Sequence, residues 1–419
     1  MSRKFSLSAV LLIVAASVLL TFSVTHLTLN QKYNRRLNEI IADYNEYAKM
    51  SEISELIASY YIGETNGALL EEATIDGLIS GLGDKYAVYY TAEEYKEKEL
   101  ESSGKLVGIG VQIIWNEESE ALEVIDVLEG SPAKEAGLLP GDLIDSVGGE
   151  KVSTLGFEAT GDRIRGSEGT QVTFSVIRDG ARQIEFTVTR AAVASPSVYR
   201  HFYVDPDKGE TKVGVIRITG FDSTTPVQFA DAVETLKSAG AVGFVYDLRG
   251  NPGGELTSVT TILDALLPEG PIVRLTDKNG SETTYSSDAD YLDIPCVVLV
   301  NGASASAAEL FTSALRDYAK EGKVDAVVMG TKTYGKGTAQ TLFRLKDNSA
   351  VSISTKKYDP PFSDNYEGIG ITPDITVELS EEAASVNFYK LDDSTDNQLM
   401  EAARAIPADE NVIPLKTIS

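Results

Sequence analysis

The chain has 419 residues, enough for two or three domains, and its hydrophobic share of 42% is ordinary for a globular protein. The net charge of −26 argues against nucleic-acid binding, because phosphate recognition needs a basic surface. One cysteine, Cys296, and two histidines, His26 and His201, allow no internal disulfide and no Cys/His cluster for zinc, so we expect neither a metal nor another cofactor.

The N-terminus is predicted to anchor the chain in the cell membrane. A short basic stretch, 2–4, precedes an apolar run, 7–24, of about the length of a membrane span. Because the positive residues come first, we expect a single-pass anchor over 1–25 and an extracytoplasmic catalytic domain. A cleaved signal peptide is the alternative, but the only small-residue cluster, 15–17, lies inside the apolar run.

A helical N-terminal region is predicted over 26–103. Residues 30–59 are polar and helix-prone, and 69–79 continue as a helix. The glycine-rich turn at 81–84 ends that helix, and Thr91 followed by acidic residues indicates the start of another.

Residues 104–190 have the pattern of a small β-rich domain. Short apolar strands alternate with turns, and Ser131, Pro132 and Gly137 mark the start and end of a short helix. The stretch resembles a PDZ domain of the circularly permuted kind found in bacterial proteases. The segments that carry this resemblance are 107–111, 131–133, 137–138 and 140–144.

The PDZ resemblance implies that this domain binds a peptide by its free C-terminus. Glycines in the first segment let successive backbone N–H groups converge on a carboxylate, and a neighbouring strand accepts the extended peptide. The residues expected to bind the peptide are Val107, Gly108, Ile109, Gly110 and Val111. A purely structural β-rich insert is the alternative.

Residues 190–196 read as a linker, and the following stretch, 191–380 in our division of the chain, is predicted as an α/β domain. Strand-like runs at 213–218, 242–247, 296–300 and 324–329 alternate with helix-like runs at 229–239, 257–267 and 310–320. A helical C-terminal tail is expected over 381–419, with a helix at 398–405. The expected fold class is therefore α/β, or α+β when all the domains are counted.

Ser306 is the candidate nucleophile, because it lies at a small-residue turn between a buried strand and a helix. Such a serine needs a base, and the two histidines are poor candidates. His26 borders the apolar N-terminal run, and His201 stands in a mixed polar and aromatic stretch.

Lys336 is the better candidate base, since a Ser–Lys pair is a known form of nucleophile and base. Burial would lower the pKa of its amine, and Gly335 and Gly337 permit close backbone approach. Gln340 follows four residues later, and on a helix it would share a face with Lys336. A phosphate-binding loop is the rival interpretation, but Gly337 stands where the Mg²⁺-binding Ser or Thr belongs.

The segments 304–309, 335–340 and 247–254, together with the PDZ segment, resemble the carboxyl-terminal processing proteases, also called tail-specific proteases. The resemblance extends over 69–376, with the motifs in the family's order. It implies an endopeptidase that finds its substrate by the C-terminal tail. The implied fold is a crotonase-like, β-spiral protease core with an inserted PDZ domain.

The resemblance also assigns roles to individual residues. Ser306 matches the nucleophile, Lys336 the general base and Gln340 the partner that orients the base. The backbone N–H of Ala307 and that of Gly253 or Gly254 match the oxyanion donors. Asp317 matches an acidic position that is important in some members, with a helix-end salt bridge as its alternative role. Arg165 matches a PDZ arginine that couples peptide binding to activation in some relatives.

The expected function is thus a membrane-anchored serine endopeptidase acting on proteins or peptides with free apolar C-termini. A homo-oligomer paired through the terminal helices and a separate activator protein are both compatible with it. Residues 358–366 depart from the family pattern near the substrate strand. The alternatives are an inert PDZ scaffold at the membrane and an acyl-transfer enzyme with a crotonase-like fold.

Overall fold

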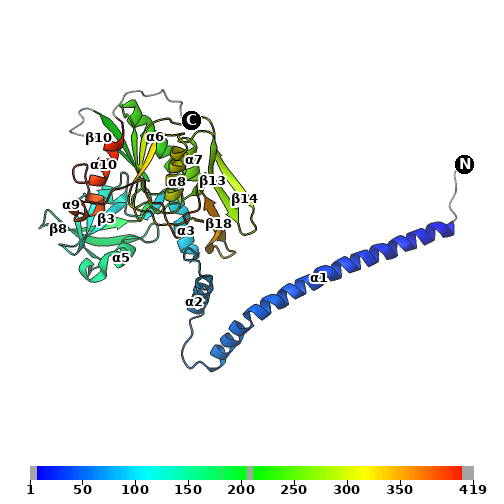
Figure 1. Ribbon diagram of the computed structural model, residues 1–419. Helices are drawn as coiled ribbons and strands as arrows, with labels where there is room; N and C mark the ends of the chain where they lie inside the picture. Colours follow the sequence, from blue (N-terminus) through cyan, green and yellow to red (C-terminus); the bar gives the residue numbers. More distant parts are fainter. Residues whose placement is uncertain (1–6, 181, 205–210, 408–419) are drawn as a thin grey trace. The chain divides into compact units, whose positions relative to one another are not determined.

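The computed structural model describes residues 7–180, 182–204 and 211–407, without the side chains of 7–16, 19, 33 and 36–46 in the first helix. The chain forms two compact units, Met1–Ile75 and Asp76–Ser419. Figure 1 shows the elements of both.

The first unit is helical, as predicted. Helix α1 runs without a break over Leu7–Tyr60, and α2 begins at Gly67 and ends at Ser80. Among the described residues, no helix is both long enough and apolar enough to cross a membrane. Most of the apolar side chains of the expected anchor, those of 7–16 and 19, lie outside the described part of the chain.

The second unit contains a β-sheet whose strand order is β3-β4-β5-β7-β8. Its strands are β3 (Val111–Asn116), β4 (Ala121–Val127), β5 (Leu143–Val147), with β6 (Glu150–Lys151) beside it, β7 (Gln171–Arg178) and β8 (Arg182–Thr189). Helix α4 (Pro132–Ala136) has the predicted cap, because the Ser131 hydroxyl accepts from Lys134 N–H at 3.2 Å and Gly137 has a φ of 88°. The second helix of this domain, α5, spans Val152–Ile164.

The expected linker at 190–196 is wrong in part, because it holds a strand. Strand β9 (Ala191–Ala194) pairs antiparallel with β2 (Lys105–Gly108), which follows helix α3 (Ala92–Ser102). Arg190 is buried, and its guanidinium donates to the carbonyl oxygens of Arg163 and Ile164 at 2.6 and 2.9 Å. This junction is therefore a packed part of the structure.

The larger core is a sheet of order β10-β11-β12-β15-β16-β19, parallel from β11 onward. Its strands are β10 (Val198–Val204), β11 (Lys212–Ile218), β12 (Phe244–Asp247), β15 (Cys296–Val300), β16 (Ala326–Gly330) and β19 (Ile375–Thr376). The helices that cover it are α6 (Thr225–Ser238), α7 (Leu256–Asp264), α8 (Ala307–Lys320) and α10 (Asn397–Ala405).

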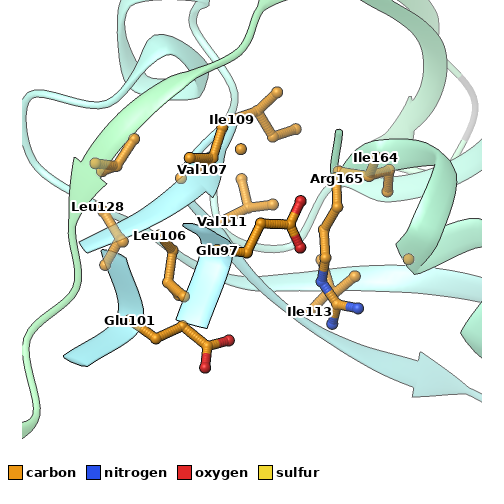
Figure 2. A pocket seen from close by; sticks show the side chains of 14 residues that line it. Glu97, Glu101, Leu106, Val107, Ile109, Val111, Ile113, Leu128, Ile164 and Arg165 are labelled. Carbon is orange, nitrogen blue, oxygen red and sulfur yellow. The ribbon is translucent and has the colours of Figure 1, made fainter. Parts of the chain in front are cut away.

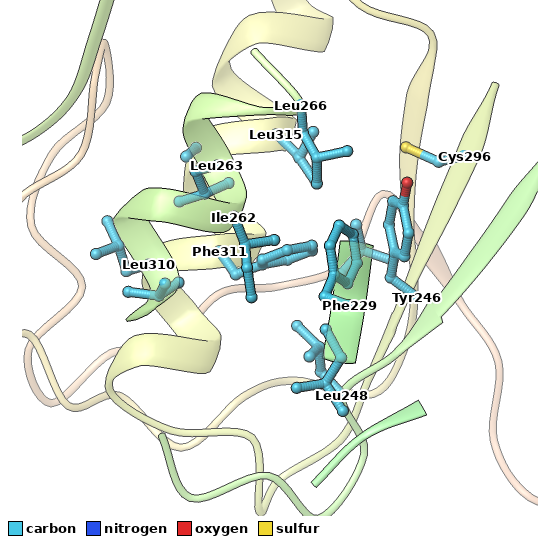
Figure 3. Close-up of a cluster of buried hydrophobic side chains, with 14 of the residues drawn as sticks. Phe229, Tyr246, Leu248, Ile262, Leu263, Leu266, Cys296, Leu310, Phe311 and Leu315 are labelled. Carbon is cyan, nitrogen blue, oxygen red and sulfur yellow. The ribbon is translucent and has the colours of Figure 1, made fainter. Parts of the chain in front are cut away.

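Both faces of this sheet are buried, which explains its near-continuous apolar strands. Phe244 and Tyr246 of β12 pack into one cluster with Phe311 of α8 (Figure 3). Val245 between them joins a second cluster with Leu399 of α10. The period of two along a strand thus divides its side chains between the two layers of helices.

A second sheet of the core joins β1 (Val88–Tyr90), β18 (Ala350–Asp359), β13 (Gly270–Asp277) and β14 (Glu282–Ser287), with β17 (Thr338–Arg344) along the other edge of β18. The strands of this second sheet lie outside the four strand-like runs that the sequence indicated for the core. The architecture as a whole is mixed α/β, as expected.

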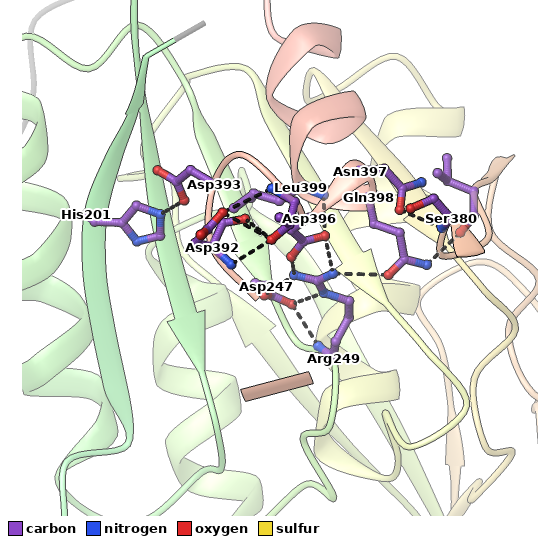
Figure 4. Close-up of polar contacts among 12 residues, drawn as sticks. His201, Asp247, Arg249, Ser380, Asp392, Asp393, Asp396, Asn397, Gln398 and Leu399 are labelled. Atoms are coloured by element: carbon purple, nitrogen blue, oxygen red, sulfur yellow. Dashed lines mark hydrogen bonds and ion pairs between the residues drawn. The ribbon is translucent and has the colours of Figure 1, made fainter. Parts of the chain in front are cut away.

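A buried ion network ties α10 to the end of β12 (Figure 4). The Arg249 guanidinium is 2% exposed and lies 2.8 Å from Asp247 and 2.6 Å from Asp396. Its N–H groups also donate to the Gln398 side chain at 3.0 Å. The guanidinium is thus enclosed by acceptors that come from distant parts of the chain.

We predict that Asp396→Asn lowers the free energy of unfolding by about 3 kcal/mol, since removing one partner leaves a buried charge uncompensated. Thermal and urea denaturation would measure this loss. Asp393, three residues before Asp396 in the same loop, is the matched control, because it forms an exposed ion pair with His201. Asp393→Asn should cost less than about 1 kcal/mol. Equal costs for the two variants would contradict the prediction.

Candidate active site

Ser306 lies in the turn between β15 and α8, as predicted. It is 7% exposed and is the N-cap of α8. Its φ of 55° lies in the left-handed region that few residues other than glycine adopt. Such strained backbone persists only where surrounding contacts hold it, and it is common at functional sites.

The carboxylate of Glu309 supplies those contacts. It is fully buried, and one oxygen accepts from Ser306 N–H at 3.0 Å and from Lys336 N–H at 2.7 Å. The other oxygen accepts from the Thr333 hydroxyl and from Gly335 N–H, both at 2.6 Å. A single side chain therefore holds the serine turn against the loop that carries the lysine. Glu309 belongs to the motif 304–309, but the sequence assigned it no role.

The Lys336 amine lies over the ring of Tyr86, 4.7 Å from its centroid. Burial lowers the pKa of Lys336, and the nearby carboxylates of Glu367, Asp84 and Glu309 oppose that shift. This is the direction that the candidate base requires. Among the described residues, no hydrogen bond joins this amine to the Ser306 hydroxyl.

The sequence did not predict the other residues around Lys336. Tyr86 donates its hydroxyl to Glu367 at 3.2 Å, and a carboxylate oxygen of Glu367 accepts from Gly337 N–H at 2.7 Å. Asp84 accepts from Ser354 N–H at 2.9 Å. Asp84 and Tyr86 belong to the 81–86 turn, whose family resemblance was the only signal in the sequence that could have indicated them.

Gln340 lies on strand β17, so the helical spacing that suggested a shared face with Lys336 is wrong. Its amide donates to the Ser354 hydroxyl at 3.1 Å and to Thr338 at 3.3 Å. A register shift between Ala339 and Gln340 interrupts the pairing of β17 with β18 at this point. No contact between Gln340 and Lys336 occurs among the described residues.

The glycine turn after β12 closes directly on the serine turn. A Cβ atom on Gly253 would lie 2.8 Å from Ser306 Cβ and 2.9 Å from Ala307 N, and the φ of Gly253 is 104°. The Gly253 N–H donates to the Asn251 side chain at 2.8 Å. In the described structure, the N–H groups of Gly254 and Ala307 have no acceptor.

Tyr358, on β18, is a further neighbour of Ser306 that the sequence did not indicate. It is 4% exposed. Burial raises the pKa of Tyr358 to about 12, and a hydrogen bond with the Ser306 hydroxyl acts in the opposite direction. The phenol is therefore neutral beside the serine.

Within the described ranges of the chain, Asp317 does not form the helix-end salt bridge that was its alternative role. One carboxylate oxygen accepts from Phe362 N–H, Ser363 N–H and the Ser363 hydroxyl, each at 2.9 Å. Asp317 lies in the last turn of α8 and binds the segment after β18, where the sequence departs from the family pattern. The helix thus carries Ser306 at one end and holds this loop at the other.

His201 lies on β10, where its Nε2 pairs with Asp393 at 2.9 Å, and it is 46% exposed (Figure 4). No contact within the described part of the chain joins it to Ser306. His26 lies on α1, where its ring stacks with Phe22. The positions of both histidines therefore agree with the expectation that they are poor candidates for the base.

The residues expected to bind a peptide line a pocket of about 210 Å³ in the PDZ-like domain (Figure 2). Gly110 has a φ of 79°, and a Cβ there would lie 2.2 Å from Ser131 Cβ. The adjacent strand β3 is at the edge of its sheet, so it can accept a further strand. Arg165 also lines the pocket and is exposed, with a 3.4 Å ion pair to Asp162.

Helix α3 contributes an acidic wall to the same pocket. Glu97 and Glu101 project into it from α3 (Figure 2). Glu101 pairs with Lys98 at 2.9 Å. The sequence did not place α3 at this pocket, because α3 lies outside the PDZ motif.

The comparisons with known proteins agree with this arrangement. The model of peptidase family S41 matches 212–377, and that of a PDZ domain matches 123–178. A carboxyl-terminal-processing protease of Synechocystis sp. is 34% identical over 306 residues, which cover 73% of this chain and 70% of that protein. The chain belongs to the carboxyl-terminal processing proteases of peptidase family S41.

Membership in this family makes the chain a serine-type peptidase with a PDZ domain, as its motifs predicted. The carboxy-terminal processing protease CtpA of Bacillus subtilis is 31% identical over 341 residues, or 81% of this chain and 70% of that protein. A Bacteroides fragilis structure assigned to the S41 proteases aligns with a TM-score of 0.54 at 15% identity, over 83% of this chain and 90% of that one. That structure supports a shared fold.

We predict that Glu309→Gln lowers the free energy of unfolding of this protease by about 3 kcal/mol, because an amide NH₂ would then face buried donors. Thermal denaturation would measure the loss. Glu321→Gln, at the exposed end of the same helix, is the control and should stay within about 0.5 kcal/mol of the parent protein. An unchanged melting temperature for Glu309→Gln would show that the carboxylate does not brace the two loops.

Proposed function

We propose that this peptidase is a membrane-anchored serine endopeptidase that recognises protein substrates by their C-terminal tails. In this proposal Ser306 is the nucleophile and Lys336 its general base. The observation that carries it is the buried Glu309 carboxylate, which accepts hydrogen bonds from the backbone N–H groups of both residues. An arrangement that holds a strained serine beside a lysine of lowered pKa fits nucleophilic catalysis.

In the proposed reaction, the Lys336 amine takes the hydroxyl proton of Ser306 as the oxygen attacks the scissile carbonyl. The same amine then gives the proton to the departing amine of the cleaved bond. In the free enzyme this amine lies over the Tyr86 ring, 4.7 Å from its centroid, and for this step it has to be within hydrogen-bond reach of the Ser306 hydroxyl. Catalytic contacts are often longer in a free enzyme than with substrate bound. Gln340, from β17, would orient the amine through the surrounding polar groups.

The oxyanion of the tetrahedral intermediate would be bound by backbone N–H groups. Those of Ala307 and Gly254 have no acceptor in the described structure, which favours them as the donors. Gly253 would serve by allowing the close approach of the two turns, since its own N–H is held by Asn251. Asp317 would act at a distance from the chemistry, by fixing the loop that follows β18.

The PDZ domain would bind the free C-terminal carboxylate of a substrate at the loop 107–111 and add its tail as a strand along β3. The apolar lining of the pocket suits an apolar last residue. Arg165, exposed at the rim, would couple occupancy of the pocket to the protease core. The single proposed substrate class is therefore proteins whose tails are free and apolar.

The finer architecture and the cellular setting are part of the same proposal. A crotonase-like, β-spiral core fits the parallel sheet and its covering helices. The basic and apolar N-terminal sequence supports a single membrane span with the protease outside the cytoplasm, and pairing of two chains or an activator is compatible with it.

After expression of the full chain, the protein should stay with the membranes through an alkaline carbonate wash. Recovery in the soluble fraction would contradict the anchor.

We predict that Ser306→Ala and Lys336→Ala each abolish cleavage of an unfolded protein with an apolar C-terminal tag, by a factor of about 100 or more. Product analysis by mass spectrometry would measure the rate. His201→Ala is the matched control and should keep the activity of the parent protein. Cleavage that survives in either dyad variant, or a loss in His201→Ala, would overturn the assignment.

The same assay tests tail recognition with a second substrate whose C-terminal carboxylate is amidated. This substrate should be cleaved more slowly than the free-acid form, because the loop 107–111 would lose the charged group that its N–H donors bind. Equal rates for the two substrates would show that the PDZ domain does not select a free tail.

A further inference from the structure

A cleft of about 550 Å³ in the protease unit leads to the catalytic turns. Its walls include Gly253 and Gly254, from the turn after β12, and Gln340 of β17. A substrate segment bound at the proposed oxyanion donors would lie in this cleft. The side chains along it are therefore placed to select residues near the scissile bond.

The charges in the cleft do not cancel evenly. Glu101 is neutralised by Lys98, whose amine lies 2.9 Å away. Asp222 is held in place by its own turn, since it accepts from the backbone and hydroxyl of Thr224 at 2.7 and 2.6 Å. Lys105 is exposed at the rim. No ion pair joins the Asp222 carboxylate to a cationic side chain among the described residues.

Glu255 is the second acid in this position. It directly follows Gly254, it lines the cleft and it is half-buried. Although it is the N-cap residue of α7, its side chain makes no capping bond, and no described residue donates to its carboxylate or pairs with it. Burial, and then the neighbouring charge of Asp222, raises the pKa of Glu255. The free enzyme leaves two acids together at a point where a cation would stabilise both.

We propose that Glu255, with Asp222 beside it, makes the cleft prefer substrates that carry a lysine or arginine next to the scissile bond. This preference rests on the proposed endopeptidase function and adds a substrate class to it. The cationic side chain would pair with the Glu255 carboxylate while its backbone lies at the catalytic turns. The net charge of −26 acts in the same direction, because it attracts cationic segments to the enzyme.

The test uses peptides that end in a free apolar residue and contain one mapped cleavage site. Lysine, glutamine or glutamate is placed singly at each of the two positions on either side of the scissile bond, and kcat/KM is measured for each peptide. At one of these positions the full-length enzyme should favour lysine over glutamine by about tenfold, the effect of one partly buried charge pair. Glu255→Gln should reduce this ratio to about one, and Glu255→Lys should reverse it in favour of glutamate.

Each ratio compares two peptides on the same enzyme variant, so it does not depend on the fraction of that variant that is folded. Glu234→Gln, on the exposed face of α6, is the control and should keep the ratio of the parent enzyme. A parent enzyme without a lysine preference, or a Glu255→Gln variant that keeps it, overturns the inference. If the parent enzyme cleaves none of the peptides while Glu255 is intact, the proposed function itself fails.

Discussion

The buried carboxylate of Glu309 is the constraint on which the active-site geometry depends. Strands β15 and β16 are parallel neighbours that pair Val300 with Gly330, so the loops after them emerge side by side. One loop leads to Ser306 and the other to Lys336. A buried carboxylate must be satisfied by protein donors, and the four donors to Glu309 among the described residues all come from these two loops.

A second set of hydrogen bonds holds the turn of Gly253, which faces the turn of Ser306. Asn251 accepts from Gly253 N–H and donates to the carbonyl of Ile218, each at 2.8 Å, and its backbone carbonyl accepts from Ala305 N–H at 3.0 Å. Ser306 and Gly253, both at positive φ, therefore face each other, and a different polar side chain holds each turn: Glu309 that of Ser306 and Asn251 that of Gly253. Neutral and charged hydrogen bonds within the protein hold the two turns in place before a substrate binds.

The sequence predicted the parts of the site that lie within one segment. Strand, turn and helix around Ser306 follow from local apolar runs and small residues, and the glycines around Lys336 and at 253–254 are visible as motifs. Contacts that join distant segments were missed, such as Tyr86 beside Gly335, 249 residues apart. A spacing of four between Lys336 and Gln340 is compatible with a shared face on a helix or on a strand, and only the pairing of β17 with β18 shows that Gln340 lies on a strand. Asp317 binds backbone N–H groups, which a search for charged partners does not find.

The Arg249 network depends on a segment of the chain that is synthesised late. Arg249 lies at the start of the turn that ends in Gly253, and one of its two carboxylate partners, Asp396, comes 147 residues later in the chain. Until the segment with Asp396 has been synthesised and packed against the sheet, the Arg249 guanidinium lacks one of its two carboxylate partners. In a nascent chain the turn that begins at Arg249 therefore gains its full set of partners only after α10 has packed against the sheet.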